Sequence, residues 1–491
     1  MIEATVEKVR RNFLRSSFII VLSFLVTATT NILLISWLTK NGGFKLVGIW
    51  GLLSAVVMYI TILDFGFINA LTRKMAIDGP LATIPIIRWL ISRFLTVVTP
   101  VLLLLYLLSF VMHQHSDKLI GFAFASCAGA IQVLGGWLIS LRLGSHEQFW
   151  FNATVIARVL VQAIVIIFFF HAYFDNPFAF LGFSFFAGSF VEILLDLVLS
   201  YKFLSDWTVS KSSKTNFSDV RSMSKGFGVA HILQKAQEPT WRMLSASFGG
   251  TAALGVFTVA IRIPSVINSS IGQAQRALLP GLGQLQTTND TSGIRNLIRD
   301  GILVQMVIVV PGFIVLLSLS QLFLDVWLGE SATNELLYST RLMAIAFLIQ
   351  CPVIPFFWAL QALGDARKIA YTTAATLSFV CIFGAAALKI GDGSVVWYAM
   401  VFVLSGVIHV GMILWWSERR WNVVRSSLKL IAWTRLSIFL VGVALLAWYA
   451  QTMRVSGLAW VNLMTSAVIF GVPYLFAVTL IYKKKLLVRS V

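Results

Sequence analysis

The feature that most limits what this chain can fold into is its series of long apolar segments. Each is long enough to cross the roughly 30 Å hydrocarbon core of a bilayer as an α-helix, which takes about 20 residues. A helix satisfies its own backbone N–H and C=O groups, as a lipid environment requires. The fourteen segments cover residues 14–38, 45–72, 85–112, 118–141, 149–172, 178–204, 224–249, 252–279, 299–325, 334–362, 368–390, 393–416, 430–450 and 457–482. The sequence therefore predicts an all-α polytopic membrane protein with about 14 transmembrane helices.

The composition agrees with this class of protein. Mean hydropathy is +0.86 and 12% of the residues are charged, about half the charged share of soluble domains. The first apolar segment is too long for the core of a cleaved signal peptide, so it is interpreted as the first span. Cys127, Cys351 and Cys381 lie in apolar runs, which predicts free thiols and no disulfide framework.

Basic residues are distributed unevenly between the two faces of the predicted bundle. If both termini share one face, that face carries 29 of the 38 Lys and Arg residues, the opposite face carries six, and three lie within spans. Positive loops mark the cytoplasmic side, so both termini are predicted to be cytoplasmic. The net charge of +18 then reflects topology, with anionic lipid headgroups as secondary partners and no nucleic acid.

Two matches indicate an internal duplication. Val47-Gly48-Ile49-Trp50 resembles Leu254-Gly255-Val256-Phe257 at an offset of 207, and Leu143-Gly144 resembles Leu363-Gly364 at an offset of 220. Six spans separate the copies, so both have one orientation, as in parallel repeats. The predicted organisation is an N-lobe of spans 1–6, a cytoplasmic linker, a C-lobe of spans 7–12, and two extra spans with a basic tail, at residues 1–204, 205–223, 224–416 and 417–491. Two pseudo-symmetric lobes suggest a central cavity and transport by alternating access.

A charged stripe interrupts the seventh span. His231, Lys235, Glu238 and Arg242 have the spacing i, i+4, i+7, i+11, which places them on one helix face at about 100° per residue. Lipid-facing charges at mid-helix would cost about 2.5–3.5 kcal/mol each, so this face is expected to look into protein or water. Such a stripe is typical of a transport path, although His231 is equally compatible with a packing role.

The first span carries an uncharged counterpart 208 residues earlier, formed by Ser23, Thr27 and Thr30. The eighth span carries a further polar face, formed by Arg262, Ser265, Ser269, Gln273 and Arg276. A guanidinium group suits a phosphate because it donates two parallel hydrogen bonds. The functional interpretation is a cationic wall in which Lys235 and Arg262 hold an anionic group. The structural alternatives are a Glu238–Arg262 pair that joins two helices, and Arg242 and Arg276 reaching toward the membrane interfaces.

Four acidic residues within spans are candidates for coupling to H⁺ or Na⁺: Asp64, Glu192, Asp196 and Glu238. Asp64 could instead pair with Arg73 or cap a broken helix at Gly66. Glu192 and Asp196 share a helix face, and two carboxylates so placed favour binding of a proton. Pairing of these acids with Arg158 or Lys202 is the structural alternative.

No catalytic motif, metal-ligand spacing or cofactor signature occurs in the sequence. The chain contains no nucleotide-binding loop, which excludes an ATP pump encoded in this chain. The sequence therefore predicts a transporter that is not an enzyme and that carries no cofactor and no metal.

Several motifs resemble a known family. Gly48-Ile49-Trp50 followed by Asp64-Phe65-Gly66-Phe67-Ile68-Asn69-Ala70-Leu71-Thr72-Arg73 resembles the second-helix signature of Wzx-type polysaccharide flippases. These belong to the multidrug/oligosaccharidyl-lipid/polysaccharide exporter superfamily. Similar stretches of the seventh, eighth and tenth helices are Glu238-Pro239, Phe248-Gly249-Gly250, Leu254-Gly255, Arg276-Ala277-Leu278-Leu279-Pro280 and Leu360-Gln361-Ala362-Leu363-Gly364.

The resemblance implies two six-helix lobes around a V-shaped cavity. It also implies flipping of undecaprenyl-diphosphate-linked oligosaccharide across the inner membrane, with polysaccharide assembly proteins as potential partners. The chain departs from the pattern in having 14 spans where the core has 12, and in the uncharged stripe of its first lobe.

Two rival functions use similar chemistry. A cation-coupled drug exporter of the same superfamily commonly carries an acidic residue in the first span, and residues 16–38 contain none. A membrane polymerase or glycosyltransferase usually needs a large outer loop with catalytic residues, and the predicted outer loops are short.

Overall fold

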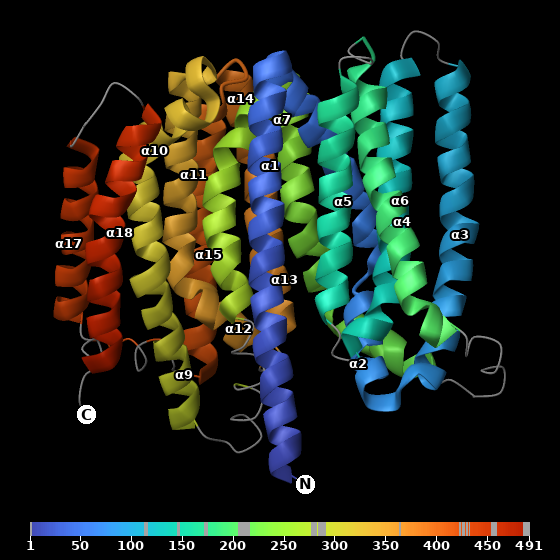
Figure 1. Cartoon of the computed structure of the whole chain (residues 1–491), viewed down its shortest axis with the longest axis horizontal. Coiled ribbons are helices and arrows are strands. Elements are labelled where there is room, and N and C mark those ends of the chain that lie inside the picture. Colours follow the sequence, from blue (N-terminus) through green and yellow to red (C-terminus); the bar gives the residue numbers. More distant parts are fainter. Residues whose placement is uncertain are drawn as a thin grey trace. The chain divides into compact units, whose positions relative to one another are not determined.

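A computed structural model describes residues 2–111, 116–144, 148–170, 175–204, 217–275, 282, 291–362, 365–421, 424, 428, 431, 433–452 and 459–484 (Figure 1). The elements within these ranges are helices. Eleven described helices are long and apolar enough to cross a membrane. Two of them, 22–64 and 229–269, each contain two of the predicted spans, and the last predicted span contains the shorter apolar helix 461–471. The chain is thus the all-α polytopic membrane protein that its sequence predicts.

The contacts divide the chain into two compact units. Unit 1 comprises Met1–Leu38 and Lys45–Met243, and unit 2 comprises Thr39–Phe44 and Leu244–Val491. The residues up to Met243 therefore pack with the first unit, whereas the sequence analysis begins its C-lobe at 224.

Unit 1 is a bundle in which α4 and α6 make the closest contact. Its elements are α1 (Ile2–Thr61), η1 (Ile62–Asp64), α2 (Phe67–Asp78), α3 (Pro80–Val111), α4 (Ser116–Gly144), α5 (Gln148–Phe169), α6 (Pro177–Leu204) and the first part of α7 (Phe217–Gln275). A Cβ atom added to Gly182 would lie 2.4 Å from the Gly121 carbonyl oxygen. The two backbones approach this closely because both residues are glycine. The apolar core between α2, α3 and α4 includes Leu71, Ile87 and Trp137.

Unit 2 continues from α7 into a second bundle. Its elements are α9 (Thr291–Val304), η6 (Gln305–Val309), α10 (Val310–Leu328), η7 (Gly329–Ser331), α11 (Asn334–Gln350), η8 (Cys351–Val353), α12 (Ile354–Ala362), α13 (Ala366–Phe379), η9 (Val380–Gly384), α14 (Ala385–Ile390), α15 (Val395–Trp421), α17 (Trp433–Thr452) and α18 (Ala459–Lys484). Both η6 and η9 are single π-helical turns, which free backbone carbonyl groups. Tyr474 on α18 donates a hydrogen bond to the Val307 carbonyl oxygen over 2.5 Å. The two extra C-terminal helices thus pack on unit 2, beside α10.

The long helices α1 and α7 each break at a glycine, and the two breaks match. Gly43 has φ 63° and ψ −168°, and Gly250 has φ 80° and ψ 177°. These backbone angles are almost restricted to glycine. The two residues lie 207 positions apart, the same offset as the sequence match at Gly48 and Gly255. Each repeat therefore joins its first two spans through the same backbone turn.

The matching breaks generate a stability prediction. Changing Gly43 or Gly250 to Ala should lower the free energy of unfolding by about 1–3 kcal/mol, because a side chain disfavours this conformation. No atom lies within 4 Å of an added Cβ at either position, so the loss would come from the backbone alone. The measurement is thermal unfolding in detergent. The control is Gly442→Ala, which adds a Cβ in open space within helix α17 and should be neutral or stabilising. Equal behaviour of all three variants would contradict the prediction.

Candidate functional site

Unit 1 contains a charged cavity of about 230 Å³. It lies among α1, η1, α2, α4, α5, α6 and α7. Its polar and charged lining side chains are those of Thr61, Asp64, Gln132, Thr154, Arg158, Glu192, Asp196 and Lys235. Three of the four predicted coupling acids therefore share one cavity with a lysine of the α7 stripe. Most of these groups lie within membrane-spanning helices, where an uncompensated charge is costly.

Asp64 organises the break between η1 and α2. Its carboxylate accepts hydrogen bonds from the backbone N–H groups of Gly66 (3.2 Å) and Ile68 (3.1 Å). It also accepts one from Trp137 Nε1 at 2.7 Å. Phe65 and Gly66 adopt left-handed conformations, with φ 49° and φ 81°. The carboxylate thus satisfies backbone donors at the start of α2, as a capping residue does. The alternative partner Arg73 has no described side chain.

Arg158 and Glu192 form an ion pair that joins α5 to α6, with Nη1 and Oε2 3.2 Å apart. Glu192 is therefore compensated by a direct partner, one of the two that the sequence analysis left open. The other, Lys202, has no described side chain. Asp196 lies one helical turn further along α6, and its negative charge adds to that of Glu192.

Asp196 is the carboxylate of the cavity with the weakest compensation. Its side chain is 2% exposed, and its Oδ1 atom is buried without a hydrogen-bond partner. The neighbouring Thr154 hydroxyl donates to the Phe151 carbonyl oxygen over 3.0 Å. A Cβ on Gly135 would lie 2.8 Å from Asp196 Oδ2, so this glycine makes room for the carboxylate. Buried polar atoms are normally satisfied, and an unsatisfied carboxylate oxygen facing a cavity is a place for a proton or a cation.

The charges of the cavity do not cancel. Three carboxylates, those of Asp64, Glu192 and Asp196, face two cations, those of Arg158 and Lys235. One negative charge is left over among the lining residues. A single proton or monovalent cation would neutralise it. Asp64 accepts from three N–H groups and Glu192 is paired with Arg158, whereas Asp196 keeps one buried oxygen without a partner, so the excess charge is assigned to Asp196.

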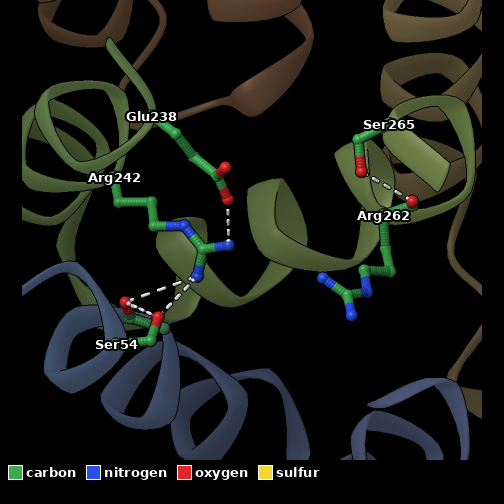
Figure 2. Close-up of polar contacts among 6 residues, drawn as sticks. Ser54, Glu238, Arg242, Arg262 and Ser265 are labelled. Carbon is green, nitrogen blue, oxygen red and sulfur yellow. Dashed lines mark hydrogen bonds and ion pairs between the residues drawn. The ribbon is translucent and has the colours of Figure 1, made fainter. Parts of the chain in front are cut away.

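The rest of the α7 stripe is bound into unit 1. The Arg242 guanidinium donates to Glu238 Oε1 (2.6 Å), to Ser54 Oγ (2.7 Å) and to the Gly51 carbonyl oxygen (3.5 Å) (Figure 2). The Arg242 side chain is only 5% exposed, while that of Glu238 is 42% exposed. This network ties α7 to the second half of α1. The ion pair recorded for Glu238 is thus with Arg242 on the same helix.

The polar residues of the first span and the remaining stripe histidine also lie in unit 1. Ser23 is buried, and Thr27 and Thr30 are half-buried on the same face of α1. The Thr30 hydroxyl donates to the Val26 carbonyl oxygen over 2.8 Å. His231 packs beside the chain break, because its Cδ2 atom would lie 3.8 Å from a Cβ on Gly66.

The polar face of the eighth span belongs to unit 2. Arg262 and Ser265 are half-buried and Ser269 is exposed, and the Ser265 hydroxyl donates to the Arg262 carbonyl oxygen over 2.8 Å (Figure 2). The side chains of Gln273 and Arg276 lie outside the described part of the structure.

Sequence reasoning did not single out Trp137, Thr154 or Gln132 as parts of the site. Trp137 lies near the end of an apolar span, where an indole ring is ordinary core material. One usable signal was its N–H group, which needs a partner when it is buried. Gln132 donates to Ser189 Oγ over 2.9 Å, and thus supports α6 one turn away from Glu192.

A family model described as "Polysaccharide biosynthesis protein" matches residues 47–334, more than half of the chain. The chain belongs to this family. This membership agrees with the resemblance of its motifs to those of Wzx-type polysaccharide flippases. No curated protein matches the chain.

Solved structures share its fold. The lipid II flippase MurJ in an inward closed conformation has a TM-score of 0.61 at 12% identity, covering 96% of this chain and 100% of that one. An inward-facing multidrug resistance MATE transporter of the MOP superfamily has 0.59 at 13% identity, covering 82% and 96%. A MOP superfamily transporter from Pyrococcus furiosus, described as having a binding pocket of reversed polarity, has 0.56 at 13%, covering 84% and 96%. At these identities the likeness establishes the fold alone.

The role of Asp64 as a helix cap can be separated from its charge. Asp64→Asn keeps an oxygen acceptor and should preserve most of the stability. Asp64→Ala removes the cap and leaves the Trp137 N–H without its acceptor, which together should cost roughly 2–4 kcal/mol. Thermal unfolding of both variants tests this, with the surface change Asp300→Ala as control. Wild-type stability of Asp64→Ala would show that the cap is unimportant.

Proposed function

We propose that this protein flips undecaprenyl-diphosphate-linked oligosaccharide across the bacterial inner membrane by alternating access, coupled to H⁺ or Na⁺. The observation that carries the proposal is the charged cavity of unit 1, in which Lys235 from α7 lies with three membrane-embedded acids. Membership of a polysaccharide biosynthesis family supports the glycan part. The fold shared with a lipid II flippase supports movement of a lipid-linked substrate.

Lys235 is the substrate-contacting residue in this proposal, because its α7 neighbours are already engaged. The Arg242 guanidinium donates hydrogen bonds to Glu238 and Ser54, so we assign it a structural role and not a substrate contact. Lys235 has a half-buried side chain on a flexible four-carbon stem, and its ammonium group suits a phosphate as a point charge. Arg262, half-buried on the polar face of α7 in unit 2, is proposed as a further substrate residue, since a guanidinium can make a bidentate contact to a phosphate.

The coupling ion is proposed to bind at Asp196. A proton on this carboxylate, or a sodium ion beside it, would neutralise the excess negative charge of the cavity. Moving an uncompensated charge through a bilayer is unfavourable. The neutralised and the charged cavity are therefore expected to favour different conformations of the transporter, which is what ion coupling requires.

The substrate role of Lys235 can be tested in proteoliposomes that contain lipid-linked oligosaccharide. Lys235→Gln should slow flipping by about ten- to a hundred-fold, as expected for loss of one charge-assisted contact, at normal protein level. Lys368→Gln, at a position outside the cavity, is the control.

A double variant separates substrate contact from charge balance within the cavity. If Lys235 only neutralises Asp64, then Lys235→Gln combined with Asp64→Asn should restore flipping. If Lys235 contacts the diphosphate, the double variant should remain slow. Rescue by the double variant would overturn the assignment of Lys235.

The coupling role of Asp196 calls for an experiment with imposed gradients. Asp196→Asn has nearly the same shape and removes the excess charge. Flipping by this variant should no longer respond to an imposed H⁺ or Na⁺ gradient, while slow exchange without a gradient persists. Asp300→Asn, an exposed carboxylate in unit 2, should respond like the wild type. An unchanged gradient response of Asp196→Asn would place the coupling site elsewhere.

A further inference from the structure

We infer that unit 2 carries a second binding site, on its outer face, which takes a neutral sugar unit of the transported glycan. The site is a cavity of about 580 Å³, lined among others by Phe44, Ala252, Thr333, Glu335, Asp392 and Ser394. It lies at the break in α7, the start of α11 and the turn between α14 and α15. The inference rests on the proposed function only in taking a glycan as the ligand.

The three turns that form the cavity lie on one face of the membrane. From Gly250 the chain crosses through the rest of α7 and returns through α9 and α10 to reach Thr333. It crosses again through α11 and α12 and returns through α13 and α14 to reach Asp392. Three further crossings, α15, α17 and α18, lead to the C-terminus. The cavity is therefore on the face opposite to the basic C-terminal tail. The charge distribution assigns the tail to the cytoplasm and the face with the cavity to the outside.

The size of the cavity selects a small organic molecule over an ion. Sites for small molecules usually enclose roughly 300–1,000 Å³, and this cavity falls within that range. An ion would instead need several ligand atoms within bonding distance of one point. Glycines let the two turns at the cavity approach closely: a Cβ added to Gly393 would lie 3.3 Å from the Gly249 Cα atom, so a larger side chain at position 393 would press on the α7 break.

The polar groups of the cavity select a ligand that donates hydrogen bonds and carries no negative charge. Glu335 Oε1 accepts from the Val395 backbone N–H over 2.8 Å, and its second oxygen is available as an acceptor. Asp392 is exposed. The lining residues include these two carboxylates and no Lys, Arg or His. Hydroxyl groups of a sugar are suitable donors, whereas uronic acids and phosphates would be repelled.

Two further features fit a sugar. Phe44 contributes an aromatic ring to the lining, beside Ala252 and Val256, and the C–H face of a pyranose packs well on such a surface. Asp392 has φ 49° and the following Gly393 has φ 84°. Asp is among the few non-glycine residues that accept this left-handed conformation. This turn leaves the Asp392 carboxylate exposed, at the lining of the cavity.

The experiment measures protection of a cysteine in the cavity by a free glycan. The three native cysteines are replaced, Ser394→Cys is introduced, and the full-length protein in nanodiscs reacts with a membrane-impermeant maleimide. The probe is the reducing oligosaccharide released by mild acid from the host's lipid-linked oligosaccharide. We expect labelling at Ser394→Cys to slow at least threefold with saturating oligosaccharide. Ser331→Cys, in the adjacent η7 turn outside the cavity, is the matched control and should label at an unchanged rate.

Charge variants test the chemistry of the site. Asp392→Asn and Glu335→Gln, added to the reporter, should each raise the oligosaccharide concentration needed for protection by about ten-fold. Glu335→Gln retains an oxygen acceptor for the Val395 N–H and should fold normally. Absence of protection at Ser394→Cys would overturn the inference. Equal protection by a polyuronic acid of the same length would overturn its selectivity for neutral sugars.

The outcomes also separate this inference from the proposed function. Flipping is measured in parallel with the wild-type protein in proteoliposomes. If the wild type flips the lipid-linked oligosaccharide but the Ser394→Cys reporter shows no protection, the outer site is wrong and the flippase proposal stands. If the free oligosaccharide protects but the wild type flips nothing, the site stands and the flippase proposal fails.

Discussion

Compensation of charges inside the hydrocarbon layer is the constraint on which the arrangement of unit 1 depends. A charged group in a membrane-spanning helix is tolerated when a partner or water lies beside it. Arg158 therefore binds Glu192, Arg242 binds Glu238 and Ser54, and Asp64 receives three N–H donors. These contacts draw α1, α2, α4, α5, α6 and the first part of α7 together. Within this otherwise compensated set, Asp196 retains a buried oxygen without a partner, and the proposed coupling chemistry follows from that exception.

Breaks in the helices position both cavities. In unit 1 the left-handed residues Phe65 and Gly66 end one helix and start the next, which brings the Asp64 carboxylate to the cavity wall. In unit 2 the turn at Gly250 opens the space that Ala252 and Gly393 line. A continuous helix would direct its backbone groups along its own axis. A broken helix exposes polar backbone groups and leaves space at the break, but it requires backbone conformations that only certain residues adopt.

The resemblance of the two repeats is greatest in the backbone and least in the side chains. Gly43 and Gly250 share a conformation at the repeat offset, yet the following spans differ. Unit 1 breaks again at Asp64-Phe65-Gly66, whereas α7 runs unbroken from the Gly250 turn to Gln275. Duplication therefore supplied two similar scaffolds, and their polar residues diverged: the charged stripe lies on α7, and its counterpart on α1 is uncharged.

Local patterns in the sequence determined the helices, the glycine turn at 250 and the helix face shared by His231, Lys235, Glu238 and Arg242. These features follow from hydropathy, from the 3.6-residue period and from the backbone freedom of glycine, all of which act over a few residues. Which partner each polar group takes was decided only in the tertiary structure. The sequence left Asp64 between Arg73 and a helix cap, and offered Arg262 as the partner of Glu238. In the fold, Asp64 accepts a hydrogen bond from Trp137 Nε1, and Glu238 forms an ion pair with Arg242. The Trp137 bond, and the Ser54 bond that fixes Arg242, depend on the rotation and depth of segments 73 and 188 residues apart, and no local period of the sequence carries that information. The Glu238–Arg242 pair is an i,i+4 contact within α7, which the helical period allows but does not select over Arg262.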